Sequence, residues 1–122
     1  MNTIVSATLI IAAVIHLLPL PGVLGRARLE ALYGVPLIDA NLVLLMRHRA
    51  VLFGSLGIYL LYAAFTPAQQ WPAFVAGFFS VLSFLVLARS TRPRNSATMR
   101  VIYADVVALA ALLVGATALL LA

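Results

Sequence analysis

Five side chains that could do chemistry lie inside hydrophobic stretches of this sequence, at a similar depth from one end of those stretches. They are His16, Arg47, His48, Arg49 and Asp105. A charge at such a depth in a membrane is costly and is usually paired. We therefore expect Asp105 to pair with His48 or with one of the two arginines. The pair would be either a structural pin that fixes helix register, or a site that handles protons or holds an anion such as a lipid headgroup.

A second set of polar side chains recurs between residues 41 and 65. At about 100° per residue, its members fall on one helix arc of roughly 60°. They are Asn41, His48, Ser55, Tyr59 and Tyr62. A stripe of this kind either makes hydrogen bonds between helices or lines a ligand cleft or proton path, and both interpretations stay open.

Signatures of the common catalytic and cofactor sites do not occur in the sequence. There is no Gly-rich phosphate loop, no HExxH zinc motif and no GxSxG nucleophile turn. Ser80 and Ser83 share one helix face, but no His–Asp pair is evidently assigned to them. With no cysteine, two histidines and three acids, a metal site would use nearly every ligand available. We expect neither a metal nor a cofactor.

The composition indicates what kind of protein must position these side chains. Of the 122 residues, 65% are hydrophobic and 9% are charged, whereas soluble domains are about half apolar and about a quarter charged. A soluble single-domain enzyme is excluded because it would lack polar surface, and a disordered chain is excluded because it would be less hydrophobic. The chain is predicted to be an integral membrane protein.

Four stretches are apolar enough to cross a bilayer core of about 30 Å as helices. The predicted spans are residues 3–20, 41–65, 72–88 and 97–121. Residues 26–33 form a short amphipathic segment, which is typical of a helix lying at the membrane interface. The prediction is an all-α fold: a single transmembrane four-helix bundle over residues 1–122, with one interfacial helix between its first two spans.

Residues of characteristic types mark the helix ends. The segment Pro19-Leu20-Pro21-Gly22 closes the first span. Gly34 is expected to cap the short amphipathic helix, and Asn95 or Ser96 the fourth span.

Charged residues occur in or beside only two connections, those after the first and the third spans. With four crossings these connections lie on one side of the membrane, which the positive-inside rule assigns to the cytoplasm. Both termini then face outward. All eight basic residues are arginines and the net charge is +5. We interpret this charge as an orientation signal and expect no nucleic-acid partner, because aromatics do not interleave with it and no soluble basic face exists.

Small residues recur at helical spacing in the second and fourth spans. The two series include Ala50, Gly54 and Gly57, and Ala108, Ala111 and Gly115. Small side chains at this spacing let helices approach closely in a membrane. The partner helix is either in the same chain or in a second copy.

Several segments resemble a known group of proteins. They are Ala31-Leu32-Tyr33-Gly34-Val35, Asp39-Ala40-Asn41-Leu42, the run from Leu45 through Arg47-His48-Arg49-Ala50-Val51-Leu52-Phe53-Gly54, Ser83-Phe84, and Arg100-Val101 with Asp105. Through them nearly the whole chain resembles short, four-span bacterial membrane proteins of unassigned function. Some members of that group are labelled phosphopantetheine adenylyltransferase, but the His-x-Gly-His phosphate motif of that enzyme is absent here. The layout is also similar to that of DoxX-like four-span proteins.

The sequence supports two functional hypotheses. The first is a small, non-catalytic module that binds a lipid, a lipophilic ligand or a larger membrane partner, in the bacterial inner (cytoplasmic) membrane. The second is a minimal membrane enzyme or proton-coupled carrier that uses the His/Arg/Asp cluster. Expected partners are the lipid bilayer and either further copies of the chain or a larger membrane complex.

Overall fold

The computed structural model describes residues 2–122, and all regular structure in them is helical. The elements are α1 (Thr3–Leu17), η1 (Leu20–Leu24), α2 (Arg26–Tyr33), α3 (Ala40–Ala64), η2 (Pro67–Gln69), α4 (Gln70–Ala88) and α5 (Ser96–Leu121). The stretches containing α1, α3, α4 and α5 are long and apolar enough to cross a membrane. The predicted all-α class and its four long helices are confirmed, and the amphipathic segment 26–33 forms α2.

Local sequence explains where the helices begin and end. The side chains of Asn2, Asp39 and Asn95 cap α1, α3 and α5 by accepting hydrogen bonds from backbone N–H groups of the first turn. Helix α2 ends at Gly34, whose φ of 65° is the left-handed conformation that favours glycine. Helix α1 ends shortly before Pro19, which cannot donate a backbone hydrogen bond.

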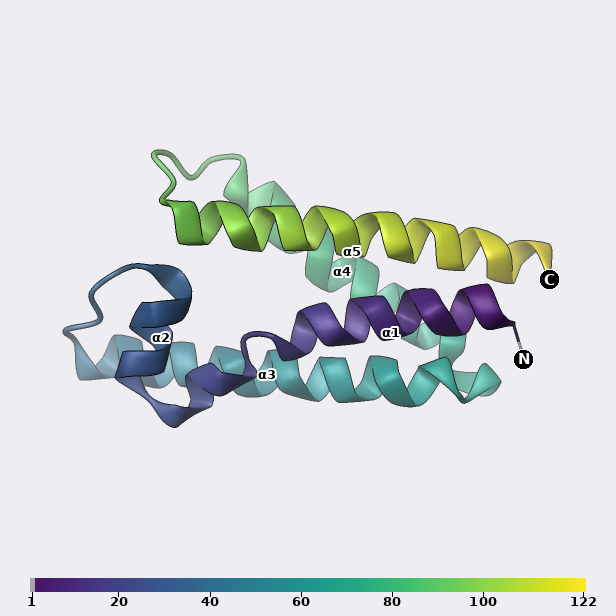
Figure 1. The fold of residues 1–122 in the computed structure, drawn as a ribbon, viewed down its shortest axis with the longest axis horizontal. Helices are drawn as coiled ribbons and strands as arrows, with labels where there is room; N and C mark the ends of the chain where they lie inside the picture. Colours follow the sequence, from purple (N-terminus) through teal and green to yellow (C-terminus); the bar gives the residue numbers. More distant parts are fainter. Residues whose placement is uncertain (1) are drawn as a thin grey trace.

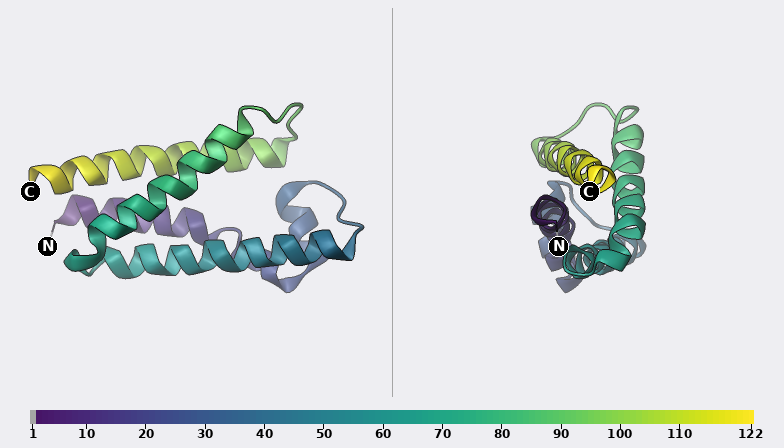
Figure 2. Two further views of the ribbon diagram at one scale, coloured as in Figure 1. Left: turned by 180° about the vertical axis from the view of Figure 1, so that it is seen from behind. Right: turned by 90° about the vertical axis from the view of Figure 1, so that its right-hand side faces the viewer.

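The four long helices form a bundle in which each packs on two others. Helix α1 lies against α3 and α5, and α4 lies against α5 and α3. Both termini and the α3–α4 turn lie at one end of the bundle (Figure 1). Helix α2 and the α4–α5 connection lie at the other end, and α4 crosses the bundle obliquely (Figure 2).

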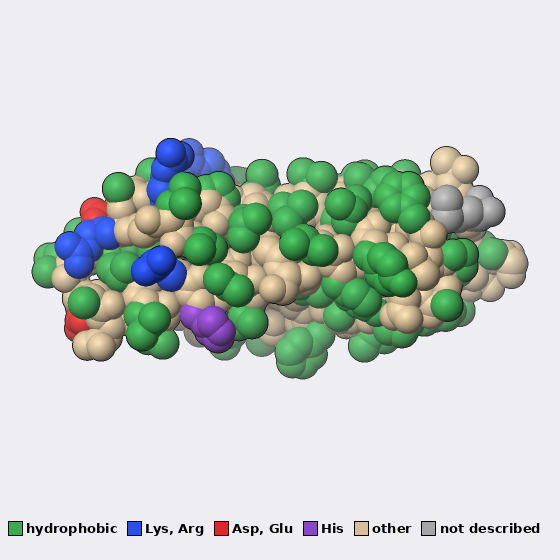
Figure 3. All heavy atoms as spheres, turned by 90° about the horizontal axis from the view of Figure 1, so that it is seen from below, with side chains coloured by type: hydrophobic (Ala, Val, Ile, Leu, Met, Phe, Trp, Pro, Cys, Tyr) green, Lys and Arg blue, Asp and Glu red, His purple; other side chains and the backbone are tan. Residues whose placement is uncertain are grey.

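The charged side chains gather at the end that holds α2, which we name the charged end (Figure 3). Most of the remaining surface is apolar. Large hydrophobic side chains point outward along every long helix, for example Val14, Ile58, Phe79 and Leu113. An outward apolar surface with charge at its end is what a membrane-spanning bundle requires.

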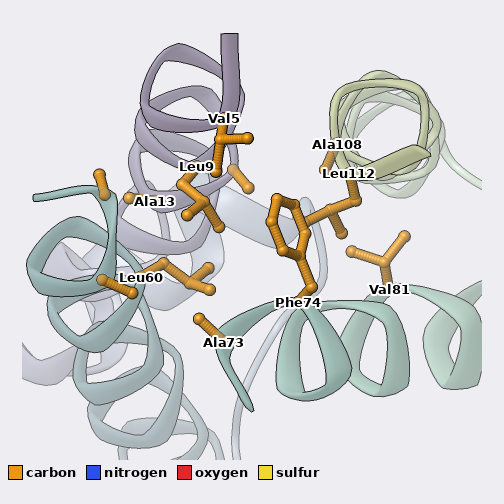
Figure 4. Close-up of a cluster of buried hydrophobic side chains, with 12 residues drawn as sticks. Val5, Leu9, Ala13, Leu60, Ala73, Phe74, Val81, Ala108 and Leu112 are labelled. Atoms are coloured by element: carbon orange, nitrogen blue, oxygen red, sulfur yellow. The ribbon is translucent and has the colours of Figure 1, made fainter. Parts of the chain in front are cut away.

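The core is densest in the half that lies towards the termini. Phe74 of α4, 1% exposed, lies among Leu9, Leu60 and Leu112, so that all four long helices contribute to one cluster (Figure 4). Gly115 of α5 faces this cluster, because a Cβ there would lie 2.8 Å from the Phe74 ring.

All six predicted helix-packing residues are buried inside the bundle: Ala50, Gly54, Gly57, Ala108, Ala111 and Gly115. A Cβ added at Gly57 would lie 3.1 Å from the carbonyl oxygen of Ala13, so α3 and α1 meet almost backbone to backbone. In the structure these residues pack within one chain. A second copy on these faces stays a prediction.

The helices differ in length, and this opens the bundle at the charged end. Helix α1 has 15 residues and α3 has 25, which corresponds to about 22 Å and about 38 Å. Beyond Leu17 the chain follows α3 through η1. Helix α2 then folds back against η1, α3 and α5, and it is anchored by Leu29, which is fully buried. The space beyond the end of α1 is thus closed by a short helix and is not filled by a long one.

Candidate functional site

A cavity of about 300 Å³ lies where α1 ends and α2 begins to cover the bundle. Its size is at the lower end of small-molecule sites, about 300–1,000 Å³. The polar or charged lining residues are His16, Tyr33, Arg49, Arg100 and Asp105. The apolar ones are Ile15, Leu18, Pro19, Ala31, Leu32, Phe53, Ala97, Val101 and Ala104. A mostly apolar wall with a few convergent polar groups is the usual make-up of a ligand site.

Helix α5 places a carboxylate in this cavity. Asp105 lies nine residues after the first residue of α5, about 14 Å along the helix. It is 6% exposed. Within residues 2–122, its carboxylate accepts no hydrogen bond of up to 3.5 Å and has no basic nitrogen within 4.0 Å. Asp105 is therefore an unpartnered carboxylate in contact with a void.

Helix α3 places an arginine at the same depth. Arg49 lies nine residues after the first residue of α3. Its guanidinium carbon lies 4.3 Å from the centroid of the Phe53 ring and 5.3 Å from that of Tyr33. One of its nitrogens also donates a hydrogen bond to the Tyr33 hydroxyl. The two aromatic rings stabilise the guanidinium cation by cation–π contact. The Tyr33 hydroxyl accepts from one of the five guanidinium N–H groups.

Helix α1 contributes His16, whose two ring nitrogens are both engaged. Nδ1 lies 2.8 Å from the carbonyl oxygen of Ala12, and Nε2 lies 2.9 Å from the Ser80 hydroxyl oxygen. A carbonyl oxygen only accepts, so Nδ1 carries the proton and Nε2 of the neutral ring accepts from Ser80. The ring also stacks on Phe53, with 5.6 Å between centroids. His16 thus joins α1 to α4 and supports the aromatic wall under Arg49.

Of the five side chains expected to share a layer, the structure brings together three: His16, Arg49 and Asp105. The other two lie outside the cavity. Arg47 donates to the carbonyl oxygen of Val23 at 2.9 Å, and His48 is exposed. Successive residues on a helix point about 100° apart, so Arg47 and His48 cannot face the cavity that Arg49 faces.

The structure does not contain the ion pair that the sequence predicts for Asp105. In the described residues, neither arginine has a nitrogen within 4.0 Å of a carboxylate oxygen, and His48 is not near the cavity. Arg49 shares the cavity with Asp105 but turns towards Tyr33 and Phe53. The aromatic stacking and the width of the cavity keep the two charges apart.

The polar stripe of α3 does not line an interior cleft in the part of the chain that the structure describes. Asn41, His48, Ser55 and Tyr62 are exposed, and Tyr59 is half-buried. Ser55 donates to the carbonyl of Val51 in its own helix, and the Tyr59 hydroxyl donates to the Gln69 side chain. The stripe faces out of the bundle, because the small residues on the opposite side of α3 take the inward face.

Sequence reasoning missed the aromatic cradle of Arg49 and the partner of His16. Tyr33 of α2 and Phe53 of α3 lie 20 residues apart in the chain, and only the fold-back of α2 places both beside one arginine. Ser80 was visible as a polar residue in an apolar span, but its histidine lies 64 residues away in the chain.

The same two side chains, Arg49 and Phe53, also border a second hollow, between α3 and α4. The rest of its lining is Leu52, Leu56, Phe79, Ser80, Ser83, Phe84 and Leu87. Phe79 and Leu87 are largely exposed, so this hollow lies on the apolar outside of the bundle.

Comparison with protein-family models, curated proteins and solved structures gave no match to this chain.

Proposed function

We propose that this protein is a small inner-membrane module that binds an amphipathic, lipophilic molecule in the cavity between α1, α2, α3 and α5. The observation that carries the proposal is the cavity itself, whose apolar walls meet an unpartnered carboxylate and an aromatic-cradled arginine. Charged groups within a membrane protein commonly mark a substrate or ion site. A lipophilic molecule with a polar head fits both kinds of lining.

Binding is favoured over catalysis by the way His16 is held. A proton relay or general base needs a nitrogen that can reach a substrate or a second titratable group. His16 Nε2 does bond the Ser80 hydroxyl, as a base bonds a serine nucleophile, but Ser80 does not line the cavity, and Nδ1 is held by the Ala12 carbonyl and not by a carboxylate. No metal-binding cluster of three His, Cys, Asp or Glu residues occurs among the described residues. The groups around the cavity are thus arranged to hold a ligand.

The proposal includes membership of the short, four-span bacterial membrane proteins that the sequence resembles. The positive-inside rule supports an orientation with the charged end in the cytoplasm and both termini outside. The cavity would then lie in the cytoplasmic half of the membrane. Helix α2 would lie at the cytoplasmic interface, with Arg26 and Arg28 near anionic headgroups.

A cavity-filling substitution tests the proposal. In Ala104→Leu, the longer side chain would occupy the space beside Asp105, because Ala104 lines the cavity. The matched control is Ala110→Leu, which makes the same change on the exposed side of the same helix. Each protein would be purified from bacterial membranes in mild detergent, exposed to bacterial polar lipid extract and analysed by native mass spectrometry.

We expect wild type and Ala110→Leu to retain one amphiphile per chain, and Ala104→Leu to lose most of it. Thermal unfolding followed by circular dichroism would confirm that all three proteins are folded. Equal retention by the three folded proteins would show that the retained molecules lie elsewhere on the surface, and it would overturn the proposal.

A further inference from the structure

One acid, Asp105, and two arginines, Arg49 and the exposed Arg100, line the cavity without forming an ion pair. The side chain of Asp105 is 6% exposed, and Arg49 of α3 lines the same cavity at the same depth. Within residues 2–122 no basic nitrogen lies within 4.0 Å of the carboxylate. Buried charges that lack a partner are strongly unfavourable, and the cavity between them has room for one.

The guanidinium of Arg49 keeps N–H groups available for an anion. Its carbon lies 4.3 Å from the Phe53 ring centroid and 5.3 Å from that of Tyr33, while Tyr33 takes a single N–H. The remaining N–H groups form the planar fork that matches phosphate or carboxylate oxygens. An anion alone would place its charge in the same small cavity as the Asp105 carboxylate, which would repel it.

We infer that the ligand is a zwitterionic amphiphile with an amine and a phosphate in its headgroup, as in phosphatidylethanolamine. This inference rests on the proposed binding function. The ammonium group donates to Asp105 and the phosphate accepts from Arg49, so that the buried acid and the aromatic-cradled arginine each receive a counter-charge. Arg100 is exposed and can be neutralised outside the cavity. Neither a purely anionic nor a purely cationic headgroup satisfies both side chains.

The surroundings of Arg49 provide a place for the hydrophobic part of such a ligand. Arg49 and Phe53 border both the cavity and the hollow between α3 and α4. That hollow is lined by Leu56, Phe79 and other apolar side chains on the outside of the bundle. Acyl chains lying in that hollow would face the lipid, with Arg49 and Phe53 at its border with the cavity.

The inference is tested by comparing two lipids that share the phosphate and the acyl chains, of which only one carries an amine in its headgroup. Wild-type protein in mild detergent would be titrated with phosphatidylethanolamine and with phosphatidylglycerol of the same chains, and binding measured by native mass spectrometry. A charge-assisted hydrogen bond to Asp105 predicts about tenfold tighter binding of phosphatidylethanolamine. Soluble glycerophosphoethanolamine is the third probe. Weaker binding of this soluble headgroup is expected if the acyl chains contribute, and equal binding would overturn the lipid assignment.

Two substitutions separate the two halves of the headgroup. Asp105→Asn is expected to remove the tenfold preference while leaving phosphatidylglycerol binding unchanged or stronger. Arg49→Gln is expected to weaken both lipids about tenfold. The matched controls are Asp39→Asn, which changes an exposed acid and keeps a capping side chain, and Arg47→Gln, whose arginine lies outside the cavity.

The outcomes distinguish this inference from the proposed function. Equal binding of the two lipids by wild-type protein would overturn the zwitterion assignment without any variant having to fold. It would leave cavity binding standing if Ala104→Leu still abolished it. Loss of the preference in Asp39→Asn as well would show that net charge, and not Asp105, causes it.

Discussion

The two halves of this bundle pack in opposite ways, and α1, which ends at Leu17, fills only one of them. Towards the termini, Phe74 fills the centre and Gly115 lets α5 approach it closely. Towards the charged end, the centre is a cavity of about 300 Å³ lined by Arg49 and Asp105. The first half has small residues and one large ring at its axis, whereas the second has charges and a void.

The difference places close helix packing in one half of the chain and the candidate site in the other. Association of membrane helices depends on close packing and on interhelical hydrogen bonds, because lipid tails are as apolar as the side chains. The terminal half provides the packing. The early end of α1 at Leu17 and the short α2 leave the charged half open, so it can hold a site without being the main source of stability.

Truncation of one aromatic residue in each half should show the largest contrast. Phe74→Ala is expected to lower the free energy of unfolding by roughly 3 kcal/mol, the low end for a buried phenylalanine, because no water is expelled when membrane helices pack. Phe53→Ala should lower it by no more than about 1.5 kcal/mol, since one side of that ring borders cavities and makes fewer contacts. Unfolding titration in sodium dodecyl sulfate, followed by circular dichroism, measures both. Equal losses would show that the charged half is packed as firmly as the terminal half.

Substitutions that enlarge a side chain should also affect the two halves differently, with a smaller difference in stability loss. In Gly115→Ala the new methyl group would overlap the Thr8 hydroxyl of α1 and lie 2.8 Å from the Phe74 ring, and overpacking should lower stability by about 1–3 kcal/mol. In Ala104→Val the added methyl groups enter the cavity, so a change within about 0.5 kcal/mol is expected. The same titration applies. A tolerated Gly115→Ala together with a damaging Ala104→Val would reverse the assignment of tight and open halves.

The smallest effect concerns the hydrogen bond at the boundary of the halves. Ser80→Ala removes the partner of the His16 Nε2 atom, 2.9 Å away, and interhelical hydrogen bonds in membranes contribute about 0.6 kcal/mol on average, up to about 1.7. Ser83→Ala is the matched control, because that hydroxyl is exposed and bonds to the Ser80 carbonyl of its own helix. Paired melting curves would resolve the difference. If Ser83→Ala costs as much as Ser80→Ala, the bond to His16 does not stabilise the bundle.

Much of the fold could be predicted from the sequence because it depends on local chemistry. Apolar runs of sufficient length predicted the four long helices, and the cap at Asn95, the left-handed Gly34 and the break at Pro19 follow from backbone preferences. The small residues also predicted the packing faces, since a helical period fixes which side chains share a side.

The candidate site was predictable only in part. Equal spacing from the helix ends placed Arg49 and Asp105 at one depth, and both side chains line one cavity. The spacing along a helix gives the depth of a side chain, however, and not the direction in which it points around the helix axis. Arg47 and His48 were therefore expected in the same layer, although their side chains point elsewhere. The polar stripe of α3 was likewise correct as a pattern on one helix, but the sequence did not indicate whether it faces inward or outward.

The sequence by itself determined that this is a helical chain suited to a membrane, with its charge at one end, because hydrophobicity and length act residue by residue. Only the tertiary structure decided which polar side chains meet. The fold-back of α2 put Tyr33 beside Arg49, and the bundle put Ser80 beside His16. It also left Asp105 facing a void and not an arginine. Such contacts depend on the relative rotation and tilt of whole helices, which many packed side chains set together and no single motif encodes.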